Sequence, residues 1–120
     1  MKNILIADDE LGMLKEIKFR LVKMGYEVII ASNGKEGLEK VMEIKPDLVF
    51  LDLHMPFLSG EEVCKLIKAD AAVRHIPVIL MTGSSEGVTQ ENILAIGADD
   101  QLLKPFEPED LMAKIKKFIG

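Results

Sequence analysis

The chain has 120 residues, a size that fits one domain and makes two independently cored domains unlikely. Hydrophobic residues make up 48% of it and charged residues 29%, a balance that excludes intrinsic disorder. The formal net charge of −5 disfavours direct binding to nucleic acid or to an anionic membrane. The single cysteine, Cys64, cannot form an internal disulfide, which favours a reducing, cytoplasmic location. The sequence has neither the pattern of a signal peptide nor an apolar run that could span a membrane.

Short apolar runs recur along the chain and predict five strands, at residues 4–7, 28–31, 48–51, 78–81 and 102–103. The first four are continuous rather than alternating and are rich in Ile, Val and Leu. This pattern is typical of strands that are covered on both faces, and it favours a parallel sheet.

Between the strands, apolar residues repeat at helical spacing and predict five helices. Their apolar faces are Leu14, Ile17, Leu21 and Met24; Leu38, Val41 and Met42; Val63, Leu66 and Ile67; Val88, Ile93, Leu94 and Ile96; and Leu111, Ile115 and Phe118. The expected start and stop signals are Gly25, Asn33 with Glu36, Pro46, Ser59 with Glu62, Ser84 or Ser85, Gly97 and Pro108. Strict alternation of strand and helix predicts a three-layer α/β sandwich with right-handed crossovers.

Polar residues lie at the ends of four predicted strands. Asp8 and Asp9 follow the first strand, Asp52 the third, Thr82 the fourth and Lys104 the fifth. The carboxyl ends of parallel strands share one edge of the sheet, where ligands bind in open α/β folds. We therefore expect these side chains to gather in one shallow pocket.

Each of these residues also has an ordinary structural explanation, such as an acidic cap on the first helix. Asp52 is less easily explained, because it follows four apolar residues and an ionised side chain is costly there unless it is solvated or paired. Clustered carboxylates need a hard cation, and oxygen ligands suit Mg²⁺ or Mn²⁺. A carboxylate beside such a cation, an ammonium and a hydroxyl can attack phosphorus, which predicts an aspartyl phosphate.

These residues resemble the receiver domain of two-component response regulators, the family of the bacterial chemotaxis regulator. The motifs that carry the resemblance are Asp8 with Asp9; Asp52, Leu53, His54, Met55 and Pro56 with Gly60; Thr82 with Gly83; and Lys104 with Pro105. The resemblance spans the whole chain, residues 1–120. It implies one receiver domain with a (βα)5 flavodoxin-like fold and a parallel sheet in the order 2-1-3-4-5.

The resemblance also implies a function. Asp52 is expected to accept a phosphoryl group from a histidine kinase or phosphotransfer protein. Asp9, Asp52 and the backbone carbonyl of His54 are expected to bind Mg²⁺, with Mn²⁺ as a substitute, while Asp8 acts mainly through water. The protein is then a signalling switch rather than a turnover enzyme, and acts on a downstream protein or a fused effector domain. Either a monomer or a weak phosphorylation-dependent dimer fits this function.

Further roles follow from the same resemblance. Lys104 is expected to pair with the phosphoryl group and Thr82 to donate a hydrogen bond to it, and the Lys104–Pro105 peptide bond is expected to be cis. Receivers usually carry an aromatic residue three positions before this lysine, where the present chain has Gln101. Either Gln101 rearranges its hydrogen bonds on phosphorylation, or the signal depends on the loop after Thr82 and the fourth helix.

The side chains of His54 and Ser84 are expected to flank the water that hydrolyses the phosphoryl group. The imidazole of His54 is expected to point toward solvent rather than to bind a metal. Partner choice is expected to lie around the first helix and the loop after the fifth strand. Cys64 is interpreted as a small buried hydrophobic residue rather than a redox sensor.

Three other functions compete with a phosphorylated receiver. A haloacid-dehalogenase-like phosphatase also uses an aspartyl nucleophile, but it carries a second acid two residues later, where this chain has His54. A flavodoxin shares the strand order, but this chain has no tryptophan and no phosphate-binding loop after the first strand. The third alternative is a receiver-like interaction module that is not phosphorylated.

Overall fold

The computed structural model describes residues 2–83 and 89–120. Strands and helices alternate through the described chain: β1 (Asn3–Ala7), α1 (Leu11–Lys23), β2 (Glu27–Ala31), α2 (Gly34–Ile44), β3 (Leu48–Asp52), α3 (Gly60–Ala69), β4 (Val78–Gly83), α4 (Gln90–Ile96), β5 (Asp100–Lys104) and α5 (Pro108–Ile119). Within these described ranges, no helix is long and apolar enough to cross a bilayer.

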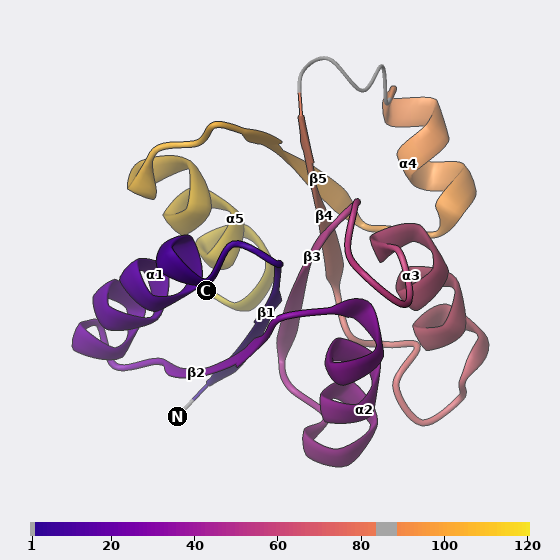
Figure 1. Ribbon diagram of the computed structural model, residues 1–120, viewed down its shortest axis with the longest axis horizontal. Helices are drawn as coiled ribbons and strands as arrows, with labels where there is room; N and C mark the ends of the chain where they lie inside the picture. The colour runs from indigo at the N-terminus through magenta and orange to yellow at the C-terminus, as the bar shows by residue number, and fades with distance from the viewer. Residues whose placement is uncertain (1, 84–88) are drawn as a thin grey trace.

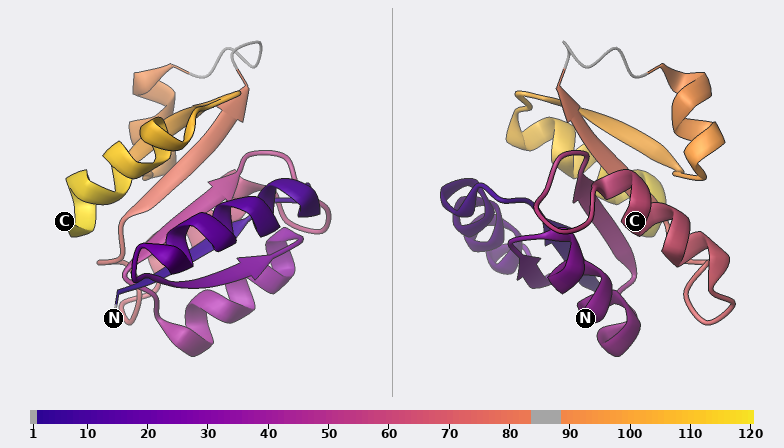
Figure 2. Two further views of the ribbon diagram at one scale, coloured as in Figure 1. Left: turned by 90° about the vertical axis from the view of Figure 1, so that its left-hand side faces the viewer. Right: turned by 45° about the vertical axis from the view of Figure 1, so that its right-hand side comes forward.

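The strands form one parallel sheet in the order β2-β1-β3-β4-β5. Helices α1 and α5 cover one face of the sheet, and α2, α3 and α4 cover the other (Figure 1). The side views show the same three layers, with the sheet between the two groups of helices (Figure 2). The predicted α/β sandwich and strand order are thus confirmed.

Alternate residues of each central strand enter two separate cores. In β3, Leu48 and Phe50 pack with α1 and α5, whereas Val49 and Leu51 pack with the helices on the opposite face. All four side chains are fully buried. Burial on both faces explains the continuous apolar runs, because neither face of such a strand has room for a polar residue.

Local sequence signals set most helix ends. The Asn33 side chain accepts a hydrogen bond from the backbone N–H of Glu36 at the start of α2. Ser59 and Glu62 form a reciprocal capping box at the start of α3. Helix α4 differs from the prediction, because it begins at Gln90 and is capped by Thr89. Three residues assigned to this region from the sequence, Ser84, Ser85 and Val88, lie outside the described residues.

Three residues predicted to lie on the apolar helix faces are exposed instead. Met24, Leu66 and Leu94 have 55%, 45% and 63% of their surface accessible. In α3, Val63, Cys64 and Ile67 are fully buried, so Cys64 takes the place on the buried face that was predicted for Leu66. Burial raises the pKa of the Cys64 thiol to about 11, as expected for an inert core residue.

Candidate functional site

Three carboxylates meet at the carboxyl edge of the sheet. Asp8 directly follows β1 and is fully buried, Asp52 is the last residue of β3 and is 7% exposed, and Asp9 is exposed. One carboxylate oxygen from each residue lies within 4.8 Å of the others. The structure therefore brings together the acids that the sequence predicted at two separate strand ends, in an arrangement that can hold a metal ion.

Lys104 at the end of β5 reaches two of these acids. Its Nζ lies 2.6 Å from a carboxylate oxygen of Asp8 and 3.4 Å from one of Asp52. Strands β3 and β4 lie between β5 and β1 in the sheet, so this side chain extends over their ends. One ammonium group thus partly neutralises the acidic cluster.

The electrostatics of the cluster shift two pKa values. Burial and then the charge of Asp8 raise the pKa of Asp52, although Lys104 acts in the opposite direction. Burial would lower the pKa of Lys104, but its hydrogen bond and ion pair with Asp8, together with the charge of Asp52, raise it. Lys104 is therefore held as a cation, while a negative charge on Asp52 is unfavourable without a further cation.

Two glycines shape the loop that follows Asp52. A Cβ atom on Gly60 would lie 2.3 Å from the carbonyl oxygen of Asp52, and one on Gly34 would lie 1.9 Å from that of Leu58. Both distances are shorter than any real contact, so each position needs glycine for close packing. Residues 53–59 are thereby held against the end of β3 and the start of α2, with the exposed side chain of His54 on the loop.

Thr82 is fully buried near the end of β4. Its hydroxyl donates a hydrogen bond to Oε1 of Gln101, at 3.2 Å, on the neighbouring strand β5. The sequence singles out both residues, and the structure adds the hydrogen bond between them. The Lys104–Pro105 peptide bond that follows β5 is cis, and Ser84 lies outside the described residues.

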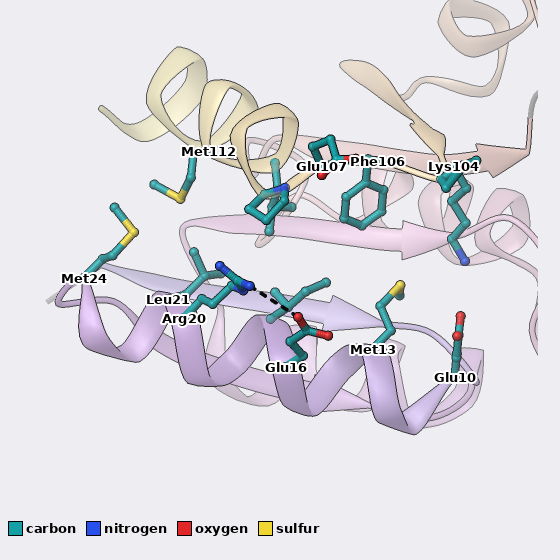
Figure 3. A pocket seen from close by; sticks show the side chains of 14 residues that line it. Glu10, Met13, Glu16, Arg20, Leu21, Met24, Lys104, Phe106, Glu107 and Met112 are labelled. Atoms are coloured by element: carbon teal, nitrogen blue, oxygen red, sulfur yellow. Dashed lines mark hydrogen bonds and ion pairs between the residues drawn. The ribbon is translucent and has the colours of Figure 1, made fainter.

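An apolar groove of about 640 Å³ runs between α1 and the segment from Lys104 into α5. Met24 and Met112 face each other at one end, and Met13 lies near Lys104 at the other (Figure 3). Helix α1 and the loop after β5, the two segments around which partner choice is expected from the sequence to lie, both line this groove. The exposed Met24 belongs to this lining rather than to the core.

The family model described as the response regulator receiver domain matches residues 4–116. The chain belongs to the response regulator receiver family. The receiver is 37% identical over 118 residues to the alkaline phosphatase synthesis transcriptional regulatory protein PhoP of Bacillus subtilis, covering 98% of this chain and 48% of that protein. It is 40% identical over 118 residues to the probable transcriptional regulator ycf27 of Pyropia yezoensis, covering 98% of this chain and 47% of that protein. The receiver therefore spans about half the length of these curated relatives.

Solved structures agree with this assignment. The receiver matches the chemotaxis protein CheY4 of Vibrio cholerae with a TM-score of 0.90 at 28% identity, covering 99% of both chains. A receiver domain from Clostridium thermocellum matches with a TM-score of 0.86 at 38% identity, covering 99% of this chain and 94% of that one. The fold of the receiver is thus the chemotaxis-regulator fold, and its relatives are signalling proteins.

Proposed function

We propose that this receiver accepts a phosphoryl group on Asp52 in a Mg²⁺-dependent reaction and acts as a switch in two-component signalling. The observation that supports this most directly is the cluster of Asp8, Asp9 and Asp52, with oxygens within 4.8 Å of one another and Lys104 3.4 Å from Asp52. The family match does not favour the phosphatase and flavodoxin alternatives.

The donor atoms of the cluster suit a hard divalent cation. Asp8, Asp9 and Asp52 offer only oxygen, and the exposure of Asp9 leaves room for water ligands, which Mg²⁺ and Mn²⁺ retain in proteins. We assign Asp9, Asp52 and the backbone carbonyl of His54 as direct ligands and Asp8 as a ligand through water. When bound, the cation supplies positive charge to the oxygens of the transferring phosphoryl group.

The chain's own groups account for the transfer step. A carboxylate oxygen of Asp52 attacks phosphorus, the bond from phosphorus to the donor's histidine nitrogen breaks, and that nitrogen retains the electron pair. Lys104 is already held beside Asp52 as a cation and pairs with the new phosphoryl oxygens. The hydroxyl of Thr82 donates to one of them. From the sequence, His54 and Ser84 are expected to flank the hydrolytic water, so substitution of both residues tests the phosphoryl lifetime.

We assign the groove between α1 and α5 as the surface that receives the phosphodonor. The end of the groove that is lined by Glu10 and Lys104 lies beside the acidic cluster, because Lys104 also contacts Asp8. A helix of a histidine kinase or phosphotransfer protein that buries apolar side chains against Met13 and Phe106 would bring its histidine to Asp52. The output passes to a downstream protein or a fused effector, because the charge of −5 disfavours contact of this receiver with DNA.

Intact mass spectrometry after incubation with acetyl phosphate and Mg²⁺ tests the phosphoacceptor. We expect a single phosphoryl adduct on the wild type, and none on Asp52→Ala or on the wild type without metal. An unmodified wild type that also fails to bind beryllofluoride while folded would contradict the proposal and leave a receiver-like interaction module. Steady turnover of a phosphate monoester would instead support the phosphatase alternative.

A further inference from the structure

Thr82 and Gln101 lie on the same face of the sheet. Leu80 of β4 packs in the core beneath α2, α3 and α4, and Thr82, two residues later, has the same orientation. In the parallel register Leu80 pairs with Gln101, so the side chain of Gln101 projects from this face too. The hydrogen bond from Thr82 therefore runs diagonally between β4 and β5 on the face that α4 covers (Figure 1).

This hydrogen bond uses the only proton that the Thr82 hydroxyl can donate. The residue is fully buried, so water does not readily replace Gln101 as its acceptor. A phosphoryl oxygen on Asp52 needs that same proton. Binding of Thr82 to Gln101 and binding of Thr82 to the phosphoryl group are consequently mutually exclusive.

We propose that the side-chain carbonyl of Gln101 is a positioning group that holds the Thr82 hydroxyl in the unphosphorylated state and thereby weakens phosphoryl binding. This inference rests on the proposed phosphorylation of Asp52. In this proposal Gln101 and the phosphoryl group compete for one hydrogen bond, the one that the Thr82 hydroxyl donates. When Thr82 turns to the phosphoryl group, Oε1 of Gln101 loses its donor and the half-buried amide must find another. This change of hydrogen-bond partner would transmit the phosphorylation of Asp52 to β5, which lies beneath α4.

Gln101→Met tests the competition, because methionine keeps the length of the side chain and removes the acceptor. In titration calorimetry with Mg²⁺ present, we expect Gln101→Met to bind beryllofluoride about fivefold more tightly than the wild type. The net free energy of one hydrogen bond corresponds to a change in affinity of about this size. Gln90→Met makes the same substitution at an exposed position of α4 and should leave the affinity unchanged.

A double-mutant cycle separates this competition from a general effect on packing. Thr82→Val removes the hydroxyl, and in that background Gln101→Met should leave the beryllofluoride affinity unchanged. An equal gain from Gln101→Met with and without the hydroxyl would overturn the inference, as would an unchanged or lower affinity of Gln101→Met alone. A wild type that binds no beryllofluoride would overturn the proposed function first, and the inference with it.

Discussion

Replacing Asp52 with asparagine should stabilise the metal-free receiver and weaken its stabilisation by Mg²⁺. At an effective dielectric constant of about 20, two carboxylates at the 4.8 Å limit of the cluster repel by about 3.5 kcal/mol. The Lys104–Asp52 ion pair at 3.4 Å offsets this by about 5 kcal/mol at the same dielectric constant. Since Asp8 and Asp9 both repel Asp52, the two repulsions together exceed this attraction by about 2 kcal/mol, and the burial of Asp52 adds to the cost of its charge.

The raised pKa of Asp52 shows that the balance is unfavourable to its charge. We expect Asp52→Asn to increase the free energy of unfolding by about 1 kcal/mol at pH 7 without metal. For a chain of this length, with an unfolding entropy of about 0.25 kcal/mol/K, the melting temperature should rise by about 4 °C. Because the folded pKa is raised above 3.8, the penalty is complete above the folded pKa and disappears as the pH falls toward 3.8. The advantage of Asp52→Asn should disappear over the same range.

Magnesium should reverse the order of the two proteins. The wild type should gain about 2.7 kcal/mol, or about 11 °C, at a Mg²⁺ concentration of about 100 times its dissociation constant. Asp52→Asn lacks one anionic ligand and should gain less. Differential scanning calorimetry in EDTA and in Mg²⁺, with ionic strength matched by sodium chloride, measures both effects, and Glu43→Gln on the exposed surface of α2 controls for net charge. The reasoning fails if Asp52→Asn is the less stable protein in EDTA, or if Mg²⁺ stabilises both equally.

Three further predictions concern the scaffold. Asp100→Asn should lower the free energy of unfolding in urea by about 1 to 2 kcal/mol at pH 7, because hydrogen bonds from Lys114 and Lys117 outweigh burial and lower the pKa of Asp100. This cost should vanish as the pH falls through the lowered pKa, and a cost that does not depend on pH would contradict this cause. In the same assay, Gly34→Ala should lower the free energy of unfolding by about 3 kcal/mol. Gly12→Ala should raise it by about 0.5 kcal/mol, because a Cβ atom on Gly12 meets no neighbouring atom. Equal effects of the two substitutions would refute the close-packing argument. A disulfide reagent at pH 8 should label native Cys64 at least about 100-fold more slowly than the unfolded chain, and comparable rates would show that the thiol is accessible.

The fold was largely predictable because several independent signals agreed along the chain. Continuous apolar runs identified the strands, and capping residues such as Ser59 with Glu62 marked helix starts within one turn. The acids at the strand ends could be placed together because parallel topology puts all carboxyl ends at one edge. Parallel topology alone therefore groups Asp8 with Asp52, without knowledge of any contact between them, and the structure places them together.

The choice of partner among nearby polar groups could not be predicted. Lys114, Lys116 and Lys117 lie near the end of α5, where their positive charge suits the helix dipole. Lys114 and Lys117 nevertheless bind Asp100 on β5, at 2.8 and 3.0 Å. The bond between Thr82 and Gln101 likewise depends on strand register and rotamer, which periodicity does not encode. The exposure of Leu66 and Leu94 has a related cause, because helical spacing does not determine which residue at the border of an apolar face is buried.

The contact between Lys104 and Asp8 joins residues 96 positions apart. Forming it closes nearly the whole chain into a loop, and the entropy cost of a loop that long is recovered only after the intervening strands have docked. The pocket that contains Asp8, Asp52 and Lys104 is therefore expected to assemble late in folding, after the helices and the individual βα units. Under the proposed function, phosphoryl uptake would then be a chemical readout of complete folding, since a nascent chain that lacks β5 has the acids but no ammonium group between them.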